Sequence, residues 1–155
     1  TGCGICGTDA QEVLDRPAPT VPHAPPDPAA VRHALGGLRA RQELNARTHM
    51  LHAAAWCMPD GGIAHVREDV GRHNALDKLI GAGLRGGVDF GRGFCLVTSR
   101  CSYEMAHKAI MAGMPALAAV SAPTARALRV AAASGLTLLA PARESGIMLP
   151  RMETD

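Results

Sequence analysis

Apolar residues in the first half of the chain follow the spacing of a helix and then of two strands. The segment that begins at Asp27, a typical helix cap, predicts an amphipathic helix that ends near Asn45. Its apolar stripe consists of Val31, Ala34, Leu35 and Leu38. Residues 52–56 and 63–66 predict two short strands, and residues 59–62 (Pro-Asp-Gly-Gly) suit the tight turn of a hairpin between them.

The second half alternates between helical stripes and short runs that are apolar throughout. A helix with Leu76, Leu79, Ile80 and Leu84 on one face is expected to end at Gly86. Residues 94–98, 116–120 and 136–140 have the composition of strands buried on both faces, and residues 102–111 and 124–133 predict helices between them. This order predicts an α/β fold, in which a largely parallel sheet has helices on both faces and the hairpin adds an antiparallel edge.

Polar side chains gather where these strands lead into helices, and ligands of such sheets bind at the carboxyl ends of the strands. The helix that follows the hairpin opens with Arg72 and His73, and the later loops hold the candidates Ser121, Thr124 and Arg143. Helix starts and cations favour an anionic ligand such as a phosphate. The alternative is that Asp69, Asn74, Ser102 and Thr124 only cap helices.

Composition narrows the class of protein. The chain has 155 residues, enough for one well-buried core, with a net charge of +2 and only 3% aromatic residues, so nucleic acid is not an expected partner. No apolar run is long enough to cross a membrane. Six of the eleven prolines lie in residues 17–28. We therefore expect residues 1–28 to be a flexible segment and residues 29–155 to form the folded domain.

Five cysteines, an odd number, argue against a disulfide framework and favour a reducing cytoplasm. Cys3 and Cys6 form a C-x-x-C pair, which can be a redox disulfide, half of a zinc site, or a thiolate that carries sulfur. We expect no metal, because the other cysteines stand alone. A zinc deaminase would need a His/Cys-x-Glu and a Pro-Cys-x-x-Cys, which His73-Asn74-Ala75 and the segment after Arg100 do not provide.

Several segments together resemble the formate dehydrogenase accessory sulfurtransferase family, FdhD/NarQ. They are Cys3-Gly4-Ile5-Cys6-Gly7, residues 52–55 (His-Ala-Ala-Ala), residues 66–78 (Val-Arg-Glu-Asp-Val-Gly-Arg-His-Asn-Ala-Leu-Asp-Lys), residues 102–105 (Ser-Tyr-Glu-Met), Lys108 and residues 121–124 (Ser-Ala-Pro-Thr). The resemblance implies a cytidine-deaminase-like three-layer fold with a mixed sheet.

The resemblance also implies a function. A cysteine desulfurase would load a persulfide on Cys3 or Cys6, and the sulfur would pass to the molybdenum bis(molybdopterin guanine dinucleotide) cofactor of formate dehydrogenase. GDP would mimic part of this cofactor. The loop after the last strand, which the family uses for the guanine dinucleotide, corresponds here to Pro141, Ala142, Arg143, Glu144, Ser145 and Gly146.

Two departures from the family leave a second function open. The family's last loop typically carries a Phe and two arginines where this chain has Pro141, Arg143 and Gly146. Family members also carry an N-terminal domain ahead of the C-x-x-C, and we expect a divergent or truncated member of the family here. The alternative is a non-catalytic chaperone that binds a guanine nucleotide or the molybdenum cofactor. A homodimer is a further expectation.

Overall fold

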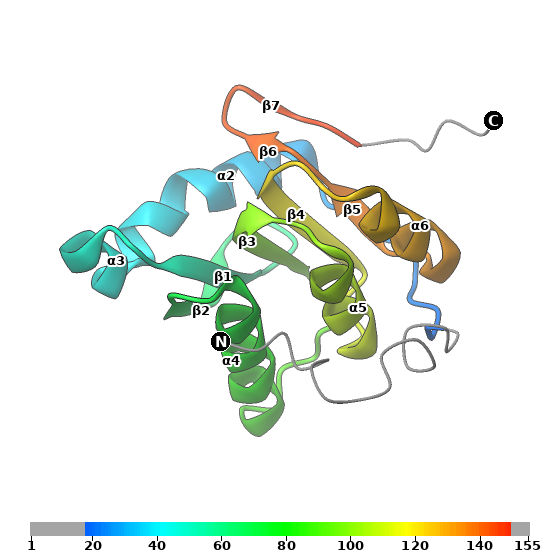
Figure 1. Ribbon diagram of the computed structural model, residues 1–155, viewed down its shortest axis with the longest axis horizontal. Helices are drawn as coiled ribbons and strands as arrows, with labels where there is room; N and C mark the ends of the chain where they lie inside the picture. Colours follow the sequence, from blue (N-terminus) through cyan, green and yellow to red (C-terminus); the bar gives the residue numbers. More distant parts are fainter. Residues whose placement is uncertain (1–17, 150–155) are drawn as a thin grey trace.

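The computed structural model describes residues 18–149, which form a five-stranded sheet between two helical layers (Figure 1). The strand order is β2-β1-β3-β4-β5. The strands are β1 (His52–Cys57), β2 (Ile63–Asp69), β3 (Phe94–Arg100), β4 (Ala116–Ser121) and β5 (Thr137–Leu139). The helices are α2 (Pro28–Leu38), α3 (Glu43–Thr48), α4 (Arg72–Arg85), α5 (Tyr103–Met111) and α6 (Ala125–Ser134).

The pairing of the strands matches the predicted mixed sheet. β1 lies antiparallel to β2 on one side and to β3 on the other, whereas β3, β4 and β5 are parallel. Because β1 runs against both neighbours, the carboxyl end of β2 lies at the same edge as the carboxyl ends of β3 and β4. The helices that follow these three strands therefore begin at one edge of the sheet, as the sequence predicted.

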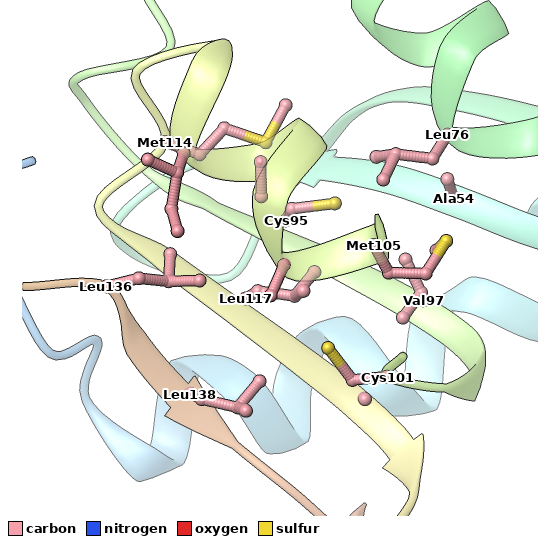
Figure 2. Close-up of a cluster of buried hydrophobic side chains, with 14 of the residues drawn as sticks. Ala54, Leu76, Cys95, Val97, Cys101, Met105, Met114, Leu117, Leu136 and Leu138 are labelled. Atoms are coloured by element: carbon pink, nitrogen blue, oxygen red, sulfur yellow. The ribbon is translucent and has the colours of Figure 1, made fainter. Parts of the chain in front are cut away.

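The two faces of the sheet are buried by different helices. On one face, Val31 and Ala34 of α2 pack in a cluster with Ala55, Phe94 and Leu96. On the other, α4, α5 and α6 bury a larger cluster, part of which is shown in Figure 2. In Figure 1, α2 lies above the sheet, α4 and α5 lie below it, and α6 lies to the right of β5. The predicted α/β fold with helices on both faces is confirmed.

The prediction that this helix runs to Asn45 is wrong beyond Leu38. α2 ends there, a 3-10 turn η1 (Arg39–Arg41) follows, and Gln42 leaves helical geometry with φ −93° and ψ 71°. The Glu68 carboxylate of β2 then accepts hydrogen bonds from Leu44 N at 2.9 Å and Asn45 N at 2.8 Å. This long-range contact satisfies backbone donors at the start of α3, and local helical spacing gives no sign of it.

The loop predicted at residues 141–146 is instead a small hairpin. β6 (Ala142–Arg143) pairs with β7 (Gly146–Ile147), and Ala142 is buried in the cluster beneath α2. Strands of two residues carry too little periodic signal to be predicted from sequence. The described part of the proline-rich segment, residues 18–27, has no helix or strand. Its Val21 N donates to Ser134 O at 2.8 Å, so this arm lies against the end of α6.

β2 is an edge strand whose outer carbonyls are occupied by the chain's own cations. Arg67 Nη1 donates to Val66 O at 2.7 Å, Lys78 Nζ donates to Glu68 O at 3.1 Å, and Arg41 Nη2 donates to Ile63 O at 3.4 Å. Charged side chains on an edge strand hinder pairing with a further strand. Within residues 18–149, none of the helices has the length and hydropathy needed to span a membrane.

A close approach between α4 and the following loop gives a test of this packing. A Cβ added to Gly83 would lie 2.2 Å from the ring of Phe90, whereas one added to Gly81 would meet only Arg85 Nη1, at 3.7 Å. Phe90 in turn packs edge-on against Trp56, with ring centroids 4.9 Å apart.

We predict that Gly83→Ala lowers the free energy of unfolding by about 1–3 kcal/mol, because the buried ring must move. Gly81→Ala in the same helix is the matched control and should raise stability by roughly 0.5–1 kcal/mol. Urea denaturation measures both. Equal stability of the two variants would contradict the packing of Phe90 on α4.

Candidate functional site

The turn between β2 and α4 is held by a carboxylate, Asp69. Its Oδ1 accepts hydrogen bonds from Gly71 N at 2.9 Å and from Asn74 Nδ2 at 3.2 Å, and its Oδ2 lies 2.5 Å from Lys78 Nζ. The hydrogen bond from Lys78, followed by that from Gly71, lowers the pKa of Asp69 to about 2. Asp69, Asn74 and Lys78 therefore support the turn, but neither Asp69 nor Asn74 is the predicted cap, because Gly71 is the N-cap of α4 and no side chain caps this helix.

Arg72 and His73, which lie between Asp69 and Asn74, have polar atoms that are buried and have no hydrogen-bond partner. Arg72 Nε and His73 Nδ1, in the first turn of α4, have no hydrogen-bond partner among the described residues. Ser102 stands at the N-cap of α5, yet its Oγ is buried without a well-formed hydrogen bond. Buried polar atoms without partners are uncommon and costly. Three of them at the carboxyl edge of the sheet suggest that a ligand supplies the missing partners.

Electrostatic effects connect the residues of this cluster. Burial, and next the charge of Arg72, lower the pKa of His73, so its imidazole is neutral at pH 7. Burial alone would raise the pKa of Glu104, but the nearby Ser102 hydroxyl, His73 and Arg72 outweigh it and lower that pKa. His52, at the start of β1, also has its pKa lowered by burial and by Arg72. We call Arg72, His73, Ser102 and Glu104 the α4–α5 cluster.

Helices α5 and α6 extend this surface with an aromatic ring and a cation. The ring of Tyr103 stacks on His107 with centroids 5.6 Å apart, and the guanidinium of Arg126 lies 4.6 Å from the centroid of Tyr103. Thr124 N donates to Cys101 O at 3.0 Å, which joins the two loops, and Thr124 Oγ1 accepts from Ala127 N at 3.2 Å. Thr124 is thus a helix cap, the alternative that the sequence left open.

The remaining predicted ligand residues lie in two places. Ser121 is exposed at the end of β4, where it pairs in register with Arg100. Arg143, Glu144, Ser145 and Gly146 are exposed on the β6–β7 hairpin, which contacts β4 and α2. Pro141 precedes this hairpin, and Ala142 is buried. The structure therefore groups Arg72 and His73 with the α5 loop, and a role for the hairpin in binding the same ligand stays a prediction.

The three described cysteines are unsuited to thiolate chemistry. Cys57, Cys95 and Cys101 are fully buried, and Figure 2 shows Cys95 and Cys101 among apolar side chains. Burial raises the pKa of Cys57 and of Cys101 to about 12, and that of Cys95 well above its usual value. Cys101 Sγ donates to Ser102 O at 3.6 Å. These thiols are packing groups.

Two further predictions concern the thiol pair and metals. Cys3 and Cys6 lie outside the described residues. Among residues 18–149, no group of three His, Cys, Asp or Glu side chains is placed to hold a metal ion.

Sequence reasoning missed Glu104 and His52 as members of the site. Glu104 follows a strand and begins a helix, and it could have been found by asking which carboxylate faces the Arg72 and His73 pair across the edge of the sheet. His52 gave no such signal, because its proximity to Arg72 depends on the antiparallel pairing that places His52 opposite Asp69.

We predict that Asp69→Asn destabilises the protein at pH 7 by roughly 0.5–1 kcal/mol, allowing for solvent screening. The pKa of about 2 in the folded protein lies below the value of 3.8 for an unperturbed Asp, so the stabilisation is present above pH 4 and is lost as the pH falls toward 2. Urea denaturation should show that the difference in free energy of unfolding between Asp69→Asn and the unmodified chain is smaller at pH 3 than at pH 7.

A second variant tests the cause of the lowered pKa. Lys78→Met should raise the pKa of Asp69 in a carbon NMR titration, and an unchanged pKa would contradict the assigned role of Lys78.

Comparisons with known proteins agree with these observations. A model of the FdhD/NarQ family matches residues 1–149. The sulfur carrier protein FdhD of Xanthomonas euvesicatoria pv. vesicatoria is 53% identical over 146 residues, which are 93% of this chain and 52% of that protein. The sulfur carrier protein FdhD of Chromobacterium violaceum is 46% identical over 152 residues, 96% of this chain and 56% of that protein. This chain thus spans about half the length of these relatives.

A solved structure shares the fold. The crystal structure of a candidate formate dehydrogenase accessory protein from Desulfotalea psychrophila superposes with a TM-score of 0.78 at 29% identity, covering 89% of this chain and 58% of that one. The mixed sheet, the α4–α5 cluster and these matches lead to one conclusion: the chain belongs to the FdhD/NarQ family.

Proposed function

We propose that this chain is a sulfur carrier that passes sulfur from a cysteine desulfurase to the molybdenum bis(molybdopterin guanine dinucleotide) cofactor of a formate dehydrogenase, in the cytoplasm. The family match, which includes Cys3 and Cys6, and the names of the curated relatives support sulfur transfer. The observation that carries the proposal is the burial of the other three thiols, whose raised pKa values keep them protonated. The chemistry is thereby left to Cys3 and Cys6.

The loading step requires one nucleophilic thiolate and one sulfane sulfur. The Cys3 thiolate attacks the terminal sulfur of the desulfurase persulfide, a new S–S bond forms on Cys3, and the old S–S bond breaks with its electron pair leaving on the desulfurase cysteine. No external oxidant or reductant is needed for this exchange. Cys6 is the helper thiol in this proposal.

The α4–α5 cluster is suited to hold the anionic part of the cofactor. Arg72 Nε offers a hydrogen-bond donor without a partner, Ser102 adds a hydroxyl beside Glu104, and His73, whose pKa is lowered, offers an imidazole that can donate from one nitrogen. When bound, the cofactor supplies the molybdenum that receives sulfur. Thr124, Ser121 and the hairpin residues Pro141–Gly146 complete the proposed contacts, and GDP serves as a probe of the guanine nucleotide part.

Sulfur loading is tested by intact mass after incubation with cysteine and a desulfurase. We expect an adduct of one sulfur atom, about 32 Da, on the unmodified chain and none on the Cys3→Ala/Cys6→Ala double variant. Cys57→Ala is the matched control and should load normally, because that thiol is fully buried. No adduct on the unmodified chain, or an adduct that persists in the double variant, would refute the proposal.

The role of the α4–α5 cluster is tested by GDP binding. Arg72→Gln removes the cation but keeps a polar side chain, and we expect calorimetry to show GDP affinity reduced by roughly tenfold, the worth of one charge-assisted contact. Arg92→Gln is the control, because Arg92 is an exposed residue that pairs with Asp89 in the loop before β3 and is not part of the α4–α5 cluster. Unchanged affinity in Arg72→Gln would show that GDP binds elsewhere.

A second candidate function is a chaperone that binds the nucleotide or cofactor without thiol chemistry. It is favoured by the unpartnered atoms of the α4–α5 cluster, which need no cysteine, and by the absence of a Phe and a second Arg from the hairpin loop. A Cys3→Ala/Cys6→Ala variant that still binds GDP and still activates formate dehydrogenase would establish this function. Loss of activation with GDP binding retained would establish sulfur transfer.

A further inference from the structure

A basic groove runs along the free edge of the sheet, away from the α4–α5 cluster. It has a volume of about 640 Å³ and is lined by β2, by one side of α4, and by residues of η1 and α3. Figure 1 shows β2 at the edge of the sheet, between α3 and α4. We call this hollow the β2 groove. None of the described residues that line it belongs to the contacts proposed above for the cofactor.

Three arginines of the β2 groove have no carboxylate partner. Lys78, the fourth cation of the lining, pairs with Asp69. By contrast, Arg41, Arg67 and Arg85 are exposed and form no ion pair with any described carboxylate. Arg41 and Arg67 donate only to backbone carbonyls of β2, at 3.4 Å and 2.7 Å. Their guanidiniums therefore keep most of their donors for an anion from outside the chain.

The two carboxylates of the groove do not neutralise these arginines. Both oxygens of Glu68 accept hydrogen bonds from the backbone of α3, at Leu44 N and Asn45 N. Glu43 lies in the first turn of α3, where the helix dipole favours a negative charge, and it forms no ion pair within residues 18–149. The groove thus presents an excess of positive charge along the edge of the sheet.

The basic side chains of β2 have the spacing of an extended peptide. His65 and Arg67 pair with Trp56 and Ala54, which belong to the core cluster on the α4 side of the sheet, so both point to that side. Side chains two residues apart in a strand repeat at about 6.6 Å, as do alternate side chains of any extended chain. The two cations of α4 that line the groove lie two helical turns apart, about 10 Å, and form a second row beside them.

The composition of the groove separates a protein ligand from a nucleic acid. None of the described residues that line it is a Phe, Tyr or Trp, so a base would find no ring on which to stack. The unpaired arginines come from η1, β2 and α4, on both sides of the sheet edge, which is a wider spread than one phosphate can contact. A chain of carboxylates can reach all of them.

We propose that the β2 groove docks an extended acidic segment of a partner protein, with alternate carboxylates beside Arg67 and Arg85 and a further one beside Arg41. The contacts are exposed charge pairs, which give fast and salt-sensitive association more than tight binding. The proposal depends neither on Cys3 and Cys6 nor on the α4–α5 cluster. It gives the chain a surface for a second macromolecule, separate from the proposed ligand site.

Fluorescence anisotropy on the full chain tests the proposal with a labelled peptide in which Glu alternates with Ser. A peptide with Lys in place of each Glu is the control probe. We expect the acidic peptide to bind and the basic peptide not to bind. Affinity for the acidic peptide should fall roughly tenfold between about 0.05 M and about 0.5 M NaCl, because salt screens exposed charge pairs.

A double variant locates the binding on the groove. Arg67→Gln/Arg85→Gln removes two of the unpaired cations, and we expect peptide affinity to fall roughly fivefold, since each exposed pair contributes a modest factor. Arg32→Gln/Arg129→Gln is the matched control, because it removes the same charge from exposed positions of α2 and α6, outside the groove. The control should bind the peptide normally, and circular dichroism confirms that both variants are folded.

The possible results separate this proposal from the proposed function. Failure of the acidic peptide to bind, or an equal loss of affinity in the two double variants, overturns the groove proposal. Tighter binding of single-stranded DNA than of the peptide, lost in Arg67→Gln/Arg85→Gln, would overturn it in favour of a nucleic acid. We expect Arg67→Gln/Arg85→Gln to keep GDP affinity and sulfur loading, and Arg72→Gln to keep peptide affinity, so either proposal can fail without the other.

Discussion

The antiparallel placement of β1 between β2 and β3 is the constraint on which the site depends. Parallel strands alone bring the starts of α5 and α6 to one edge of the sheet, but α4 follows a strand of the hairpin. Because β1 reverses direction, β2 ends beside the start of β1, and α4 begins at that same edge. The alanines at positions 53–55 are almost fully buried, which keeps both helical layers close to this strand.

The segment from Glu68 to Lys78 divides its polar residues between those that support the turn and those that we propose bind a ligand. Glu68 caps α3, and Asp69 holds the entry turn of α4 with Asn74 and Lys78. These contacts satisfy their polar atoms internally, whereas Arg72 and His73 between them are left with buried, unpartnered nitrogens. A rigid turn that presents unsatisfied donors binds a ligand at low entropic cost, because the ordering has already taken place on folding.

Much of this arrangement could be predicted from the sequence, because the strands and helices have clear periodicity. The apolar runs became β3, β4 and β5, and the stripe of Leu76 and Leu79 became the buried face of α4. The break at Gln42 and the β6–β7 hairpin could not be predicted, since the first is fixed by a contact with Glu68 and the second consists of two-residue strands.

The occupied outer carbonyls of β2 limit how two copies of this chain could associate. A partner strand that approached this edge would have to displace Arg67 from Val66 O and Lys78 from Glu68 O before it could form a continuous intermolecular sheet. In a symmetric pair of β2 strands, the displaced Arg67 and Lys78 of one copy would lie close to those of the other copy. Repulsion between these like charges opposes the pairing. A dimer of this chain, if one forms, would therefore avoid the β2 edge and use surfaces formed by helices or loops.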